Sequence, residues 1–118
     1  MQATFTNSTA LLQNAISVGL YQPLIAQLEK DFLLSNLQID IGLGMFPEDL
    51  GSTLHEKVYH LIMEKFSAYL NLLYVIDVPE SAFKEIQVTD VVAVAEQVSF
   101  LILKREFQKV KLKELYSN

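Results

Sequence analysis

In the stretch TDVVAVAEQVSFLILKREFQKVKLKEL, residues 89–115, apolar residues recur at helical spacing. We predict one long helix that begins at Thr89 or Asp90 and ends near Leu115. One apolar stripe consists of Phe100, Leu103, Phe107 and Val110, and a thinner strip on roughly the opposite side consists of Leu101, Leu112 and Leu115. A helix with two apolar strips packs against two neighbours. One of these neighbours could belong to another chain.

Two further helical patterns precede this stretch. The first covers residues 8–36, with Ser8 as its candidate N-cap, and it is interrupted near residues 19–23 by Gly19 and Pro23. The second runs from Thr53 to Asp77, where Thr53 and Glu56 have the spacing of a capping box. A short segment, residues 79–86, is expected to form one or two helical turns with Pro79 at its first position. We expect the core to include Val58, Leu61, Ile62, Leu72, Val98 and Leu103, and we expect Glu56, Glu64 and Asn71 to be exposed.

These patterns predict an all-α fold, an elongated antiparallel bundle of three long helices in a single domain, residues 1–118. The first helix is kinked or broken near residues 19–23, and a complete break would make four helices. A 27-residue helix is roughly 40 Å long, longer than the roughly 35 Å diameter of a compact globule of this size. Apolar and polar residues alternate over residues 37–45, which indicates an extended segment. We prefer a loop lying across the bundle, and the alternative is an α+β fold with a small sheet involving residues 37–45.

The composition describes an apolar and acidic protein. Hydrophobic residues make up 51% of the 118 residues, charged residues make up 19%, and the net charge is −5. The charged share is below the ~25% of an average domain, which favours a partner or self-association. No apolar run reaches the ~18 to 20 residues that a membrane span requires. The N-terminal stretch has no basic or apolar region typical of a secretory signal, so we expect a cytoplasmic location.

The stretch TLHEKVYHLIMEK, residues 53–65, has the residue types of a metal site but not the spacing. His55 and His60 are five residues apart, and at 100° per residue their directions diverge by about 140°. No Glu-x-x-His pair of the di-iron type is present. We therefore interpret these residues as part of a solvated helix face and predict no metal and no cofactor.

Other catalytic and nucleotide-binding motifs are missing or incomplete. Gly42 and Gly44 lack the third glycine of a dinucleotide fingerprint, because Pro47 stands in its place. The chain has no cysteine, which excludes thiolate chemistry and Cys-bound zinc. Asp40, Asp77 and Asp90 follow or interrupt apolar runs, so one of them could be a buried carboxylate, although such residues are more often caps or turn formers.

The basic C-terminal segment is the most informative surface. Residues 104–118 carry a net charge of +3, which leaves −8 on residues 1–103. The cations have three interpretations: complementing the helix dipole, docking onto an acidic surface of this protein or of another, and binding nucleic acid, which the pI of about 4.9 disfavours. The predicted partner-binding residues are Leu101, Arg105, Lys109, Leu112, Lys113 and Leu115.

The sequence therefore favours a small helical module for protein–protein interaction or regulation that acts as a homo-oligomer. Its partners would be a second copy and possibly another protein, with no nucleic acid and no membrane span. The alternative is a small enzyme or ligand-binding bundle whose site is built from scattered side chains. Inward-facing polar groups that converge in a closed pocket would favour this alternative.

Overall fold

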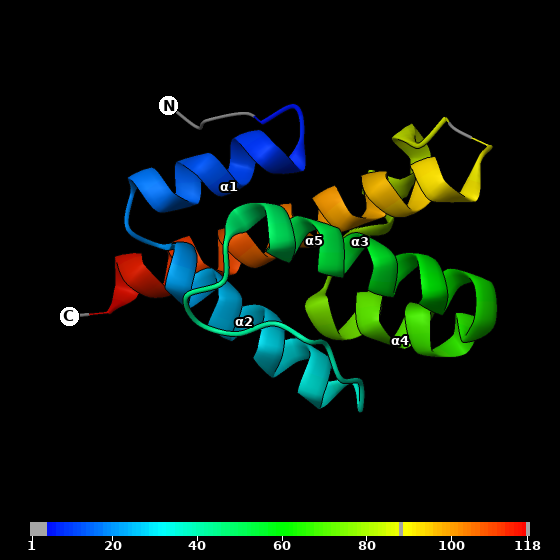
Figure 1. Ribbon diagram of the computed structural model, residues 1–118, viewed down its shortest axis with the longest axis horizontal. Coiled ribbons are helices and arrows are strands. Elements are labelled where there is room, and N and C mark those ends of the chain that lie inside the picture. The colour runs from blue at the N-terminus through cyan, green and yellow to red at the C-terminus, as the bar shows by residue number, and fades with distance from the viewer. Residues whose placement is uncertain (1–4, 88, 118) are drawn as a thin grey trace.

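The computed structural model describes residues 5–87 and 89–117 of the chain (Figure 1). Residues 1–4 of the N-terminal stretch, which entered the prediction of location, lie outside this description. The described residues form five α-helices and one 3-10 helix and no strand, so the all-α class is confirmed and the α+β alternative is wrong for this part. The elements are α1 (Ser8–Ser17), α2 (Tyr21–Leu34), α3 (Pro47–Glu64), α4 (Phe66–Ile76), η1 (Glu80–Glu85) and α5 (Val91–Tyr116).

Helix α5 is the centre of the fold and contacts each of the other four α-helices (Figure 1). It begins after Asp90, whose carboxylate accepts a hydrogen bond of 3.0 Å from the Val92 N–H. Its buried apolar residues are Ala95, Val98, Ile102, Leu103, Phe107 and Val110. The long predicted helix is thus present, with ends within two residues of those expected.

The overall shape is more compact than the predicted elongated bundle. The described chain measures 41 × 29 × 25 Å and has a radius of gyration of 13.6 Å, close to the value expected for a compact globule of this length. The predicted arrangement of three long helices is not found, because each of the first two helical patterns forms two separate helices. None of the described helices is both long and apolar enough to cross a membrane.

The first pattern is broken completely, and Gly19 rather than Pro23 marks the break. Gly19 has a φ of +75°, a left-handed conformation that glycine adopts without steric cost. Pro23 lies in the first turn of α2, where its missing N–H has no intrahelical partner to lose. The N-cap of α1 is Asn7, whose side chain accepts a hydrogen bond of 2.8 Å from the Ala10 N–H, so the expected cap at Ser8 is wrong.

The second pattern is broken at Lys65, where the sequence gives no signal for a break. Lys65 is at once the C-cap of α3 and the N-cap of α4, with φ −141° and ψ 62°. A single helix over residues 47–76 would be about 45 Å long, longer than the molecule. Because α4 folds back against α3 (Figure 1), both halves bury their apolar stripes in one core.

The start of α3 differs from the expected start at Thr53. The helix begins six residues earlier, with Pro47 at its first position and two acidic residues, Glu48 and Asp49, in its first turn. Proline has the right φ for this position, and carboxylates favour a helix N-terminus. These two effects explain why α3 begins at Pro47 and not at the capping box of Thr53 and Glu56.

The segment between α2 and α3 is a loop that crosses α2 (Figure 1). The Tyr21 hydroxyl donates a hydrogen bond of 2.6 Å to the Met45 carbonyl, and the Gly44 N–H donates one of 3.1 Å to the Gln22 side chain. Four apolar side chains of the loop pack against the core, namely Leu37, Ile39, Ile41 and Met45, while Leu43 is 70% exposed. The preferred prediction of an extended loop is therefore confirmed.

The predicted core is nearly all buried. Five of its six residues are fully buried, and the exception is Ile62, which is half-buried at the edge of the core. Glu56, Glu64 and Asn71 are exposed as expected. The segment after Pro79 forms the 3-10 helix η1, with Pro79 as its N-cap rather than its first residue.

Candidate interaction surfaces

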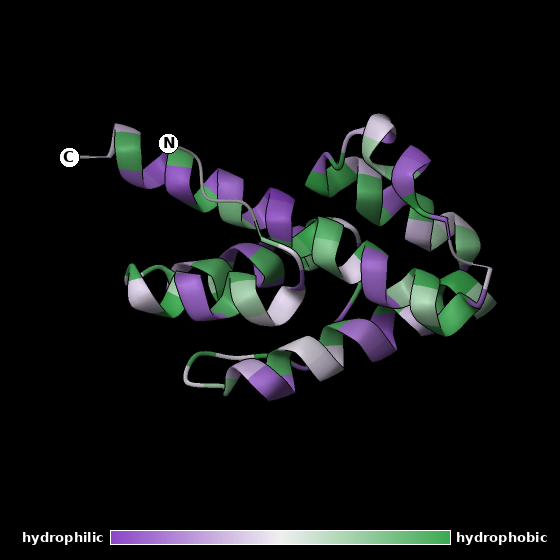
Figure 2. Ribbon diagram, turned by 90° about the horizontal axis from the view of Figure 1, so that it is seen from above, coloured by the Kyte–Doolittle hydropathy of each residue, from purple (hydrophilic) through white to green (hydrophobic). Residues whose placement is uncertain are grey.

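The C-terminal end of α5 lies at one end of the long axis in Figures 1 and 2. All residues from Lys111 to Ser117 are exposed. Of the predicted partner-binding residues, Leu112 and Leu115 are 49% and 72% exposed, whereas Leu101 is half-buried. Tyr116, which the sequence analysis did not include, is 80% exposed and lies on the same face as Leu112.

The three cations among the predicted partner-binding residues contact two different helices of the same chain. The Arg105 guanidinium donates to the Asp77 carbonyl at 3.0 Å and to its carboxylate at 3.1 Å, at the end of α4. Lys109 lies 2.8 Å from Asp31 of α2. Lys113 donates a hydrogen bond of 2.5 Å to the Gln27 side chain, also on α2.

A buried polar cluster lies between α2 and α5. It consists of Gln27, Asp31, Ser35, Glu106 and Lys109. Glu106 has no exposed surface, Asp31 is 3% exposed, and Lys109 contacts both carboxyl groups, at 2.8 Å from Asp31 and 3.2 Å from Glu106. Two carboxylates and one ammonium would leave a net negative charge in a site that water does not reach, and this is costly.

A proton on Glu106 removes this excess charge. Burial, together with the hydrogen bond and negative charge of Asp31, raises the Glu106 pKa to about 9, although the nearby Lys109 ammonium opposes this rise. Neither Glu106 carboxyl oxygen has a hydrogen-bond partner of good geometry among the described residues, although the Lys109 ammonium lies 3.2 Å from one of them. A proton on Glu106 would let this side chain donate to the Asp31 carboxylate. Burial alone would raise the Asp31 pKa as well, but the hydrogen bonds from Glu106, Lys109 and Gln27 outweigh burial and lower it.

This cluster joins α2 and α5 through the contacts of Lys109. The Glu106 carboxyl group in it has no exposed surface. The carboxylates that the sequence analysis considered for burial, Asp40, Asp77 and Asp90, are all exposed. The burial of Glu106 could have been predicted from its position in the helical repeat. It lies four residues from both Ile102 and Val110, on the buried side of α5.

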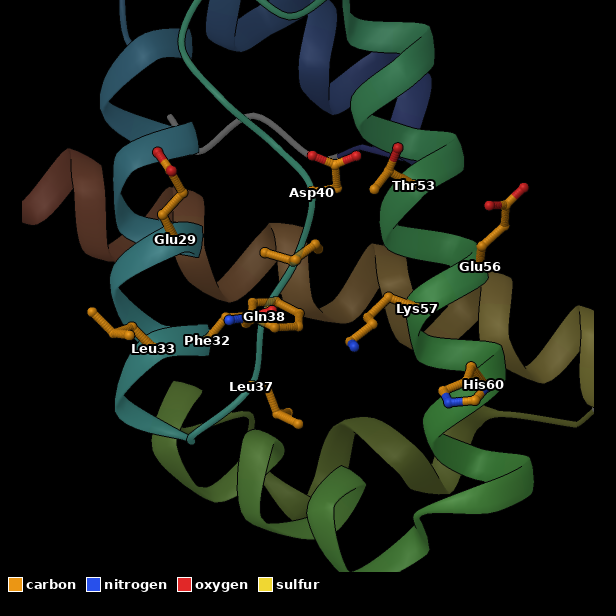
Figure 3. A pocket seen from close by; sticks show the side chains of 11 residues that line it. Glu29, Phe32, Leu33, Leu37, Gln38, Asp40, Thr53, Glu56, Lys57 and His60 are labelled. Atoms are coloured by element: carbon orange, nitrogen blue, oxygen red, sulfur yellow. The ribbon is translucent and has the colours of Figure 1, made fainter.

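A large groove lies between α2, the following loop and α3 (Figure 3). Its volume is about 810 Å³. Its polar side chains do not converge: Lys57 points into the groove, Glu56 points away from it, and Asp40 lies near Thr53 at one end (Figure 3). The full lining is Glu29, Phe32, Leu33, Leu37, Gln38, Ile39, Asp40, Thr53, Glu56, Lys57 and His60.

The two histidines of α3 have different neighbours. His55 Nε2 lies 3.0 Å from the Val92 carbonyl, whereas His60 Nδ1 lies 3.1 Å from the Glu64 carboxylate. Over residues 5–87 and 89–117, no three His, Cys, Asp or Glu side chains are close enough together to hold a metal ion. The predicted solvated face agrees with the exposure of Glu56, His60 and Glu64.

An apolar groove lies between α4 and η1 and has a volume of about 680 Å³. One wall is an exposed face of α4 formed by Phe66, Leu70 and Tyr74, at 54%, 51% and 84% exposure. The other wall contains Pro79 and Phe83. This face is not evident from the sequence, because the pattern over Thr53 to Asp77 predicts one longer helix with a single apolar side.

No protein-family model, curated protein or solved structure matches the chain. The geometry of the described residues is therefore the basis for the functional argument.

Proposed function

We propose that the protein is a small helical interaction module that self-associates through the outer face of α5. The observation that carries this proposal is the exposed helix end, residues 111–117, with Leu112, Leu115 and Tyr116 on its surface. Apolar side chains at such a protruding end gain little from their own chain, whereas burial against a partner stabilises them by ~25 cal/mol per Å². A cytoplasmic location remains part of the same proposal.

Three cations of α5 already have contacts within their own chain, in line with the interpretation that they meet an acidic surface of this protein. Arg105, Lys109 and Lys113 contact α2 and the end of α4 in their own chain, so they fix the position of α5 within the protein. Apolar contact would then supply most of the affinity, and the charges would contribute little at the surface. For this reason we expect association to persist in 1 M salt, where the Debye length is ~3 Å.

The ligand-binding alternative has weaker support. The groove in Figure 3 is open, and its polar side chains point in different directions. A small-molecule site would instead bring a few polar groups to one point in an enclosed, mostly apolar cavity.

Sedimentation equilibrium over a wide range of protein concentration tests the proposed self-association. Wild type should associate, and Leu112→Asp should dissociate, because the change places a carboxylate in an apolar contact. Leu43→Asp is the matched control, since Leu43 is 70% exposed in the loop before α3, and this variant should associate like wild type. A wild type that sediments as a folded monomer at all concentrations would disprove the proposal.

A further inference from the structure

We propose that the groove between α4 and η1 receives the C-terminal end of α5 from a second copy of the chain. This inference rests on the proposed self-association and identifies the surface that the helix end contacts. The groove and the helix end are two unpartnered apolar surfaces of the described chain that differ in shape. One is concave, and the other is a projecting helix.

The shape of the groove suits a helix. Phe66, Leu70 and Tyr74 are spaced four residues apart and form a continuous apolar ridge along α4. Pro79 and Phe83, from the segment after α4, also line the groove. Recognition of this kind lays the apolar face of an amphipathic helix into a hydrophobic groove, with anchor residues three and four positions apart.

The end of α5 has the matching pattern. Leu112, Leu115 and Tyr116 occupy positions i, i+3 and i+4 and are all exposed, so they lie on one face of the last turns. Figure 2 shows apolar and polar residues alternating along this end of the helix. Such a segment can bury its apolar face and leave its polar face in water.

The charges are also complementary. The groove is bordered by the acidic residues Asp77 and Glu80. Asp77 already pairs with Arg105 of its own chain, so Glu80 leaves this rim negative. The helix end carries Lys111 and Lys113 against Glu114 and is therefore positive. Opposite charges would orient the helix end and disfavour a contact between two like-charged ends.

The helix end of one chain does not reach the groove of the same chain. Figure 1 shows the C-terminal end of α5 at one extreme of the long axis, whereas α4 and η1 lie toward the other end. Because residues 91–116 form one continuous helix, the contact requires a second copy. Two copies that exchange helix ends form a closed dimer, and a one-way contact forms a chain of copies.

A mixing experiment tests this contact. Leu70→Asp changes only the groove, and Leu112→Asp changes only the helix end. Each variant alone should show a dissociation constant raised by roughly tenfold or more, because a carboxylate enters an apolar contact. An equimolar mixture should recover a heterodimer, since the intact end of the first variant fits the intact groove of the second. Sedimentation with one variant carrying a fluorescent label measures this.

Two controls keep the outcome interpretable. Tyr74→Asp repeats the groove change at a side chain that is 84% exposed, so it should fold even if Leu70→Asp does not. Circular dichroism checks the fold of each variant. If wild type associates while Tyr74→Asp and Leu70→Asp associate equally well, the groove is not the receptor, and only the general proposal of self-association stands. If wild type is a monomer, both proposals fail together.

Discussion

The Lys109 ammonium of α5 lies 2.8 Å from the Asp31 carboxylate of α2, although these two residues are 78 positions apart in the sequence. Both side chains are mostly buried, at 18% and 5% exposure. The same ammonium contacts Glu106. This cation is therefore central to the contact between α2 and α5.

Replacing Lys109 by Met should strongly destabilise the protein. The change removes the cation but leaves the Asp31 carboxylate buried, and breaking a buried pair in this way costs ~3 to 5 kcal/mol. Urea unfolding followed by circular dichroism measures the difference in free energy. Lys104→Met is the matched control, because Lys104 is exposed on the same helix and should change stability by about 0.5 kcal/mol or less. Equal effects of the two variants would show that the pair contributes nothing specific.

The protonated state of Glu106 gives a pH dependence. Its pKa is about 9 in the folded protein, against an ordinary value of about 4.3 in an unfolded chain. Between these values the folded state binds one more proton than the unfolded state. The free energy of unfolding should therefore fall as pH rises from 5 to 9, by at most about 1.4 kcal/mol per pH unit. The lowered Asp31 pKa does not add to this pH dependence. Its contribution to the free energy of unfolding is fully present above the ordinary Asp pKa and is lost only at lower pH.

Glu106→Gln tests this directly. Glutamine keeps the size of the side chain and has an N–H that can donate to Asp31, without a titrating proton. We expect the variant to be as stable as wild type or more stable at pH 7 to 9, and to lose the pH dependence. Denaturant melts at pH 5, 7 and 9 measure this. The same slope in both proteins would mean that Glu106 is ionised in the folded state.

Tyr21→Phe should loosen the loop before α3. The Tyr21 hydroxyl donates a 2.6 Å hydrogen bond to the Met45 carbonyl, and its removal leaves that partly buried carbonyl without this donor. Global stability should fall by ~1 kcal/mol. Amide exchange of residues 41–46 should increase more than exchange in α5. Tyr74→Phe is the control, because the Tyr74 ring is 84% exposed. Unchanged exchange in the loop would show that its apolar residues alone hold it.

Zinc should not bind through α3. His55 and His60 face different neighbours, and Glu64 is the carboxylate nearest to His60. A single histidine and carboxylate provide two ligands, whereas structural and catalytic zinc sites use three or four protein ligands. Isothermal titration with zinc should show no micromolar site that is lost in His60→Ala. A site that His60→Ala removes and His55→Ala does not would contradict the geometry.

The sequence predicts most of the helices but not how they divide. Gly19 signals the first break through its backbone freedom, and alternation over residues 37–45 signals the loop. Lys65 carries no such signal, because its neighbours favour helix and their apolar period continues from Leu61 to Leu72. Only the size of the core shows that one helix of this length could not bury both halves. Tertiary packing here overrides local preference.

For the residues of α5 as well, the sequence predicts some features and not others. The second apolar strip of α5 is visible in the sequence, but the exposure of Leu112 and Leu115 and the half-burial of Leu101 depend on which helices lie beside it. The contacts of Arg105, Lys109 and Lys113 within the chain could not be predicted from the sequence, because they depend on which helices lie beside α5. Glu106 was missed because acidic residues in a basic, helical segment are usually solvated. Its burial follows from its position on the side of α5 that also carries the buried Ile102 and Val110.

Leu61→Ala tests the phase of α3 against the core. Leu61 is fully buried, and it lies three residues after the buried Val58, so both belong to the stripe that faces α4 and α5. Truncation of such a leucine removes apolar contact and leaves a cavity, and it should cost ~2 to 5 kcal/mol. Met63 is 54% exposed two residues later, so Met63→Ala should cost much less. Urea unfolding of both variants checks the difference. A loss under ~1 kcal/mol for Leu61→Ala would mean that α3 presents another face to the core.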